Sequence, residues 1–156
     1  MDKIAVIRIR GTMNVNKEIK DTLNMLRLFN KHYCVILEST PVYVGMLKKI
    51  KDYVTWGEIN KETFLALLKE RGRLPGNKRL TEDYLKDKNK LNFEEFANEF
   101  LNNKKSLKDI PGLKLFFKLK PPVKGFERGG IKNPFSLGGV LGYRKDKIND
   151  LLIRMI

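Results

Sequence analysis

The sequence predicts an α+β fold, a small sheet with helices on one face, and two observations lead to this prediction. First, three short segments near the start of the chain are rich in apolar and β-branched residues, which is typical of strands. Second, the segments after the first and third of them repeat apolar residues at i, i+3 or i+4 spacing, which is typical of helices, and the segment after the second opens with a helix-start signal. The resulting order, β-α-β-α-β-α, is that of an α+β sandwich.

The boundaries of these elements follow from local signals. Thr40 offers a hydroxyl cap ahead of Pro41, and Asn60 offers an amide cap for the helix that follows it. In the first strand, one face changes from apolar to cationic and ends with Arg8 and Arg10. The expected strands are residues 4–10, 32–38 and 53–59. The expected helices are residues 17–30, with Asn16 as the cap, 41–51 and 61–71.

The pattern changes after residue 72. Asn92 and Glu95 form a capping box that starts a second short helix of this region. We expect a core domain at residues 1–72 and an extension at residues 73–156 that packs on the core as one unit. The expected parts of the extension are a basic loop at 71–79, a helix capped by Thr81, a strand at 113–120, a glycine-rich stretch at 125–142 and a helix from Asp146.

The charge of the chain indicates a polyanionic partner. The 156 residues carry a net charge of +14, from 32 Lys and Arg against 18 Asp and Glu. Residues 71–80 hold four basic and no acidic residues, and residues 111–156 hold ten basic and three acidic residues. Glycine and proline in these regions let the backbone approach phosphates closely, and no helix resembles an exposed recognition helix, so RNA is favoured over DNA. An acidic membrane surface is the weaker alternative.

The composition also excludes several classes of protein. No apolar run approaches the roughly 18 to 20 residues of a transmembrane helix. The first residues resemble neither a signal nor a transit peptide. A single cysteine, Cys34, excludes an internal disulfide framework and fits a reducing cytoplasm. We therefore expect no membrane partner, no small-molecule substrate and no cofactor.

The candidates for catalysis are few. His32 and Cys34 point to the same face of the second strand, so a thiol–imidazole pair is conceivable, but no third residue orients them. The loop at residues 72–78 lacks the glycine spacing and the Lys-Ser/Thr pair of a nucleotide-binding loop. The carboxylates show no metal-ligand spacing, and one histidine with one cysteine does not make a zinc site. We predict neither catalytic residues nor a metal site.

Specific motifs run through the chain in order. They are IAVIRIRG at residues 4–11, IKDTLNMLRL at 19–28, YVGMLKKI at 43–50, DYVTWG at 52–57, GRLPGNKRLT at 72–81, IKNPF at 131–135 and GGVLG at 138–142. Together they resemble the large-subunit ribosomal protein family numbered thirty in bacteria and archaea and seven in eukaryotes. The later motifs are similar to the archaeal and eukaryotic form, and the lack of a long basic N-terminal extension favours the archaeal type.

The resemblance implies a three-stranded antiparallel sheet covered by helices, related to ferredoxin-like folds. It also implies a structural role in the cytoplasmic ribosome, with large-subunit ribosomal RNA and neighbouring ribosomal proteins as partners. The matched motifs, or positions beside them, supply the candidate RNA-binding residues Arg8, Arg10, Arg27, Lys48, Lys49, Arg71, Arg73, Lys78, Arg79 and Lys132. Charge alone adds Lys118, Lys120, Lys124 and Arg128.

Two aromatic residues are candidates for stacking on exposed bases. Trp56 and Phe126 lie in or beside basic segments, with packing in the core as the alternative for each. The leading hypothesis is a non-enzymatic constituent of the large ribosomal subunit. One alternative is a small RNA-processing enzyme, which would need His32, Cys34 or a scattered carboxylate as general base. Another is a regulator that controls translation of its own message through RNA mimicry.

Overall fold

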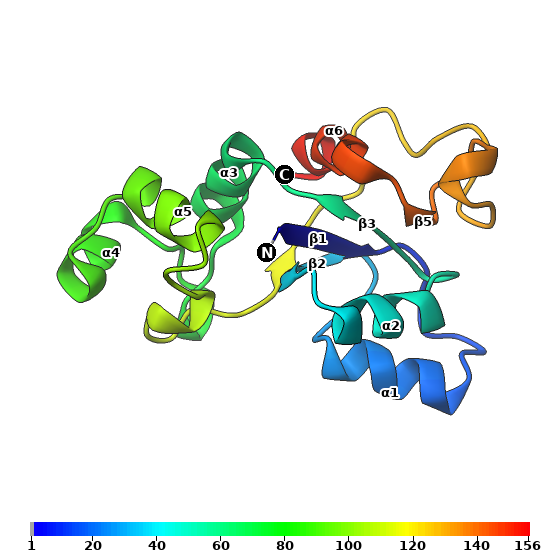
Figure 1. Ribbon diagram of the computed structural model, residues 1–156, viewed down its shortest axis with the longest axis horizontal. Coiled ribbons are helices and arrows are strands. Elements are labelled where there is room, and N and C mark those ends of the chain that lie inside the picture. The colour runs from blue at the N-terminus through cyan, green and yellow to red at the C-terminus, as the bar shows by residue number, and fades with distance from the viewer. Residues whose placement is uncertain (1) are drawn as a thin grey trace.

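The sheet is built around β1 (Lys3–Arg8). In the computed structural model, which describes residues 2–156, β1 pairs antiparallel with β2 (Tyr33–Glu38) and with β3 (Val54–Glu58). Two short strands extend the edges: β4 (Phe117–Lys118) is antiparallel to β2, and β5 (Gly142–Tyr143) is parallel to β3 (Figure 1). The strand order is β4-β2-β1-β3-β5. The expected sheet of three strands is therefore corrected to five, with the expected three at its centre.

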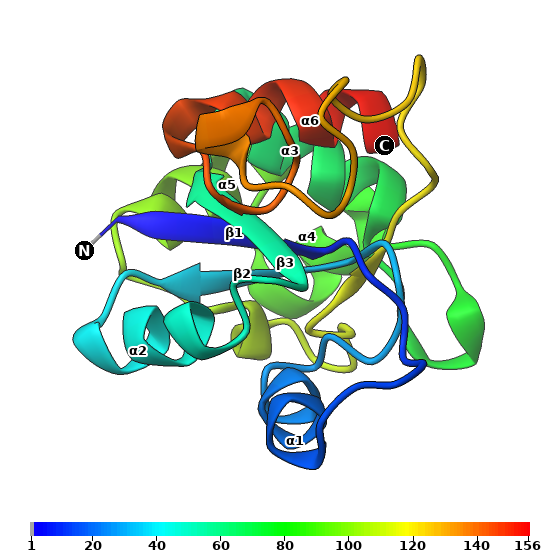
Figure 2. The ribbon, with the colours of Figure 1, turned by 90° about the vertical axis from the view of Figure 1, so that its right-hand side faces the viewer.

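Helices cover both faces of the sheet, so the prediction of helices on one face is wrong. Figure 2 shows α1 and α2 on one side of the central strands and α3 and α6 on the other. The helices of the described chain are α1 (Lys17–Met25), α2 (Pro41–Lys49), α3 (Lys61–Arg71), α4 (Glu82–Asn89), α5 (Phe93–Leu101) and α6 (Ile148–Met155).

The side chains of β1 explain the two covered faces. All six residues of β1 are buried, and successive side chains of a strand point to opposite faces. Val6 belongs to the same buried cluster as Leu23 of α1 and Leu47 of α2. Ile7 belongs to the other cluster, which includes Leu151 of α6. A continuous apolar run of this kind is typical of a strand buried on both faces.

The larger cluster joins the extension to the first 72 residues. Phe64 of α3 and Phe100 of α5 stack with ring centroids 4.5 Å apart, and Phe96 of α5 is also fully buried. Phe117 of β4 lies in the same cluster. One apolar core is therefore shared by residues on both sides of the boundary that the sequence indicates.

Most of the expected helix caps are confirmed. The side chains of Thr40, Asn60 and Thr81 each accept a hydrogen bond from the backbone N–H three residues on. The capping box at Asn92 is present as well. Asn16, in contrast, makes no side-chain cap bond, so this part of the prediction for α1 is wrong.

Helix α1 ends before the expected residue 30. The N–H of Leu28 donates to the carbonyl of Leu23 at 2.9 Å, and the N–H of Arg27 donates to the carbonyl of Asn24 at 3.0 Å. Arg27 has a φ of 62°. This pair of bonds around a left-handed residue is a Schellman motif, which terminates a helix. Glycine usually takes that position, so an arginine there gave no stop signal.

The strand expected at residues 113–120 is only two residues long. The N–H of Lys114 donates to the carbonyl of Arg73 at 2.9 Å, and the N–H of Lys120 donates to the carbonyl of Met155 at 3.0 Å. Backbone groups on both sides of β4 therefore bond to the basic loop and to α6 instead of to β2. The alternation of apolar and mostly basic residues at 113–120 therefore reflects which side chains are buried, and not a long series of hydrogen bonds between strands.

Replacing Asn60 with alanine should lower the free energy of unfolding by about 1 kcal/mol, because α3 loses its N-terminal cap. The lost bond joins Asn60 Oδ1 to the N–H of Thr63 at 2.8 Å. Urea unfolding followed by circular dichroism measures the change. Asn98→Ala is the matched control, since Asn98 is exposed within α5 and alanine favours a helix interior. Equal losses in both variants would contradict the assigned role of the cap.

Candidate nucleic-acid interface

Cations gather at the end of the sheet where β1 ends and β2 begins. The guanidinium of Arg10 lies over the ring of Tyr53 at 5.2 Å, just before β3. The ammonium of Lys118 lies over the ring of Tyr33 at 5.8 Å, at the start of β2. We define the sheet-end surface as Arg10, Lys31, Lys118, Lys120 and Lys124, of which the four lysines are exposed and Arg10 is half-buried.

The basic loop at residues 71–79 is folded back on itself. Arg73 and Arg79 form an antiparallel bridge, and the Arg73 guanidinium donates to the carbonyls of Glu70 and Gly72 at 3.1 Å each. Arg79 forms an exposed ion pair with Glu70. Arg73 is half-buried, whereas Lys78 and Arg79 are exposed. Among the predicted residues of this loop, Arg73 therefore holds the loop in place, whereas the side chains of Lys78 and Arg79 are exposed to solvent.

The C-terminal end of the chain links the basic loop to the sheet-end surface. The half-buried Arg71 guanidinium donates to the backbone carbonyl of Ile156. The preceding residue, Met155, accepts from the N–H of Lys120 at 3.0 Å. Arg71 therefore fixes the terminus, and the two basic regions, distant in sequence, are neighbours in the fold.

Arg8 is not part of the exposed surface. Its side chain is 1% exposed and donates to the carbonyls of Leu28 at 2.7 Å and Phe29 at 3.0 Å. Further bonds reach the carbonyls of Arg10 and Gly11. Burial lowers the pKa of the Arg8 guanidinium from its ordinary value. The structure therefore assigns Arg8 the task of holding two loops together, in place of the phosphate contact that the sequence predicts.

The other predicted cations are exposed but more widely spaced. Lys48 and Lys49 lie in the last turn of α2, where positive charge is favourable, and Lys49 pairs with Glu18 at 3.3 Å. Arg27 lies just after α1. Arg128 and Lys132 are exposed in the glycine-rich loop. Of these residues, Arg27 and Arg128 are close in sequence to the sheet-end surface, each four positions from one of its lysines, Lys31 and Lys124.

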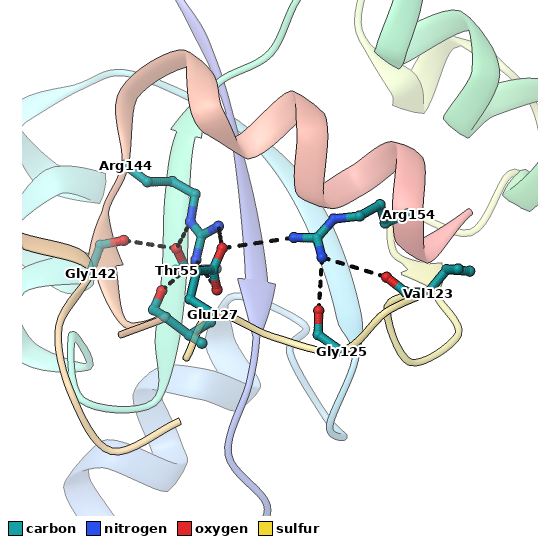
Figure 3. Close-up of polar contacts among 8 residues, drawn as sticks. Thr55, Val123, Gly125, Glu127, Gly142, Arg144 and Arg154 are labelled. Atoms are coloured by element: carbon teal, nitrogen blue, oxygen red, sulfur yellow. Dashed lines mark hydrogen bonds and ion pairs between the residues drawn. The ribbon is translucent and has the colours of Figure 1, made fainter. Parts of the chain in front are cut away.

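The glycine-rich loop is held by a buried polar cluster (Figure 3). Arg144 is 2% exposed, and its guanidinium donates to Glu127 Oε1 at 2.7 Å. Its Nε donates to Thr55 Oγ1 at 2.8 Å, and the same hydroxyl donates to the carbonyl of Gly142 at 2.9 Å. Arg154 of α6 approaches Glu127 from the other side at 3.8 Å. The cluster fastens both ends of the loop to β3 and α6.

Two turns of the glycine-rich loop approach each other so closely that only glycine fits at Gly129 and Gly139. A side-chain carbon at Gly139 would lie 2.1 Å from the carbonyl oxygen of Asn133, and one at Gly129 would lie 2.5 Å from the carbonyl oxygen of Gly138. The N–H of Gly129 donates to that same Gly138 oxygen at 2.9 Å. These contacts bring two turns of the loop together.

Arg144 and Glu127 were missed as structural residues by sequence reasoning. They are 17 positions apart, and neither lies on a recognisable helix or strand of its own. The available signal was Glu127 itself, since residues 111–145 contain no other acidic residue. A lone carboxylate among many cations is a natural partner for a buried arginine.

The two candidate stacking residues are both half-buried and in contact with other rings. Phe126 stacks on His32 with centroids 6.1 Å apart and packs against the larger core. Trp56 lies 6.3 Å from the ring of Tyr143. Tyr143 donates a hydrogen bond to Glu58, which raises the pKa of its phenol to about 12. Much of the ring surface of Trp56 and Phe126 is therefore occupied within the protein.

His32 and Cys34 do not form a catalytic pair. Cys34 is fully buried in β2, and burial raises the pKa of its thiol well above the ordinary value. His32 precedes β2 with a φ of 66°, so it lies outside the strand, and its ring stacks on Phe126. Burial, with Lys31 nearby, lowers the pKa of His32 and favours the neutral imidazole. A thiolate–imidazolium pair is disfavoured at both members.

Within residues 2–156, no group of three or more His, Cys, Asp or Glu side chains is placed to hold a metal ion. Over the same range, no helix combines the length and the apolar character needed to cross a bilayer.

A sequence model of the family described as ribosomal protein L30p/L7e matches residues 4–54. The chain is 51% identical over 152 residues to the large ribosomal subunit protein uL30 of Methanococcus maripaludis strain S2, covering 97% of this chain and 98% of that protein. The chain belongs to the L30p/L7e family of ribosomal proteins.

Other members of the L30p/L7e family are similarly close. Identity is 50% over 149 residues to uL30 of Methanopyrus kandleri, covering 95% of this chain and all of that protein. It is 48% over 152 residues to uL30 of Nanoarchaeum equitans, covering 97% of each. These archaeal relatives span both the sheet and the extension, so the resemblance drawn from the motifs, including its archaeal type, is confirmed.

Proposed function

We propose that this L30p/L7e protein is a structural constituent of the large ribosomal subunit that binds and orders ribosomal RNA. The single observation that favours this function most is the gathering of cations at the sheet-end surface beside the basic loop. Relatives about 50% identical along nearly the whole chain are named large ribosomal subunit proteins. Location in the cytoplasm, on the ribosome, follows from this proposal.

The proposed mechanism is electrostatic and positional. Phosphates would be neutralised by Arg10, Lys118, Lys120 and Lys124 at the sheet-end surface, and by Lys78 and Arg79 of the basic loop. Because these side chains project from a packed sheet and from loops held by backbone contacts, little backbone conformational entropy is lost on binding. Arg27, Lys48, Lys49, Arg128 and Lys132 would contact RNA or neighbouring ribosomal proteins around this surface.

We assign the chain no catalytic step and no cofactor in this role. Cys34 is buried and the pKa of its thiol is raised, which disfavours it as the general base of the RNA-processing enzyme among the alternatives. We also propose that residues 1–72 act as the core domain, related to ferredoxin-like folds. Residues 73–156 would be an extension that shares its apolar core and presents the basic loops.

Binding to large-subunit ribosomal RNA should weaken steeply with salt. Neutralising four to six phosphates gives a slope of log K against log salt of about −3 to −5. Filter binding of purified protein to transcribed ribosomal RNA measures this slope. In cell lysate, the protein should migrate with large subunits on a sucrose gradient after a moderate-salt wash. A flat salt response, or recovery only in the soluble fraction, would contradict the proposal.

A further inference from the structure

Three aromatic side chains form a continuous cluster beside the sheet-end surface. Phe29 meets Phe116 edge to face with centroids 5.7 Å apart and an interplanar angle of 87°. Phe116 stacks on Tyr33 at 5.2 Å and 8°, and Lys118 lies over the Tyr33 ring. We name Phe29, Tyr33 and Phe116 the aromatic cluster. Its outermost member, Phe29, is 41% exposed.

The charge around the aromatic cluster has one sign. Tyr33 pairs with Lys118, and Phe116 contacts the rings of Phe29 and Tyr33, so the segments 27–33 and 114–120 meet at these residues although more than eighty positions separate them in sequence. These two segments contain no Asp or Glu. Their basic residues are Arg27, Lys31, Lys114, Lys118 and Lys120. An apolar ring surface in such surroundings suits a ligand that is both aromatic and anionic.

The position of Phe29 is fixed from within the protein. Buried Arg8 donates to the carbonyls of Leu28 and Phe29 at 2.7 and 3.0 Å. The turn that carries Phe29 lies between the Schellman motif at Arg27 and the left-handed residue His32. Phe29 is therefore held by the body of the protein, and its exposed ring is not the tip of a free loop. A ring held in place loses little freedom on contact with a ligand.

We propose that the exposed ring of Phe29 is a stacking platform for an unpaired base of ribosomal RNA. Lys31 and Lys118 lie beside the aromatic cluster, where they would neutralise the phosphates that flank this base. Aromatic platforms within cationic grooves bind single-stranded nucleic acid in this way, because every base offers a π-face. The inference rests on the proposed function and adds to it a residue that the charge pattern and the family motifs did not select.

The test compares three substitutions of Phe29 in filter binding to transcribed large-subunit ribosomal RNA. Phe29→Ala and Phe29→Leu should each weaken binding about 10-fold, because both remove the π-face. Phe29→Tyr should bind within about twofold of the unchanged protein. Ile153→Ala is the control, since Ile153 is 61% exposed on α6 and its loss should leave affinity unchanged. An unchanged melting temperature of each variant checks the fold.

Salt dependence separates stacking from charge. Phe29→Ala should lower affinity at every salt concentration and leave the slope of log K against log salt unchanged, whereas Lys118→Gln should reduce the slope by about one. Irradiation at 254 nm should also cross-link RNA to the peptide that contains Phe29. These results together would support the stacking platform.

Other outcomes would overturn it. Full affinity of Phe29→Ala for the RNA would show that the ring does not stack on a base. Full affinity of Phe29→Leu together with reduced affinity of Phe29→Ala would show the same. If Phe29→Ala bound free RNA normally but was missing from assembled subunits, this would mean that the aromatic cluster contacts a neighbouring ribosomal protein instead of a base. Failure of the unchanged protein to bind the RNA would instead remove the proposed function itself.

Discussion

Replacing Glu127 with leucine should lower the free energy of unfolding by about 3–5 kcal/mol. The substitution leaves the guanidinium of Arg144, which is 2% exposed, without its carboxylate partner, and an uncompensated buried charge is among the most costly defects in a folded protein. The loop that follows Glu127 should also become more accessible to proteases. Urea unfolding and limited proteolysis measure the two effects.

A double-mutant cycle makes this prediction specific to the pair. Arg144→Met combined with Glu127→Leu should cost clearly less than the sum of the two single substitutions, because no charge then remains buried. Arg154→Met is the control, since Arg154 is more exposed and lies 3.8 Å from Glu127; it should cost about 1 kcal/mol or less. Additive single effects would mean that the pair contributes no coupling.

Neutralising the sheet-end surface should produce the largest loss of RNA binding. Changing Lys31, Lys118, Lys120 and Lys124 together to glutamine removes four exposed charges. Losing four phosphate contacts should weaken binding to large-subunit ribosomal RNA about 100- to 1,000-fold near physiological salt and reduce the salt slope by about three to four. Filter binding across a salt series measures both quantities.

The extension offers a matched control for this variant. Lys86, Lys88, Lys90 and Lys104 are also exposed, and they lie in residues 81–110, where seven acidic residues offset six basic ones. Changing these four lysines to glutamine alters the net charge by the same amount. We expect affinity within about threefold of the unchanged protein. Equal losses in the two variants would mean that net charge, and not the sheet-end surface, governs binding.

Local signals in the sequence predict the parts of this fold that depend on a few neighbouring residues. The caps at Thr40, Asn60 and Thr81 were found because a side-chain oxygen and a backbone N–H three residues on suffice to make them. The sequence also predicts the three central strands, because their apolar runs are long enough to be recognised. The sequence predicts too long a helix α1, because the residue with a positive φ that terminates it is Arg27 and not the glycine that usually marks a helix end.

Features that depend on distant segments could not be read from the sequence. The sequence predicts a strand at residues 113–120, of which only the two residues of β4 pair with the open edge of β2. It does not predict β5, whose two residues pair with the open edge of β3. Arg8 looks like a surface cation in the sequence, yet the turn after α1 folds over it and supplies carbonyl acceptors. For the candidate interface, the basic segments were identified from charge, whereas the aromatic cluster required the pairing of β2 with β4.

The place of α6 in the larger core has a consequence for folding during synthesis. Ile148, Leu151 and Leu152 of α6 lie in the same buried cluster as Ala5 and Ile7 of β1, so the last helix of the described chain covers a face of the first strand. About 90 residues separate β3 from α6, and translation at about 5–20 residues per second takes roughly 5–18 s to supply them. During that interval the nascent chain exposes the apolar part of the sheet face that α6 later covers, which is a binding site for chaperones and a target for aggregation.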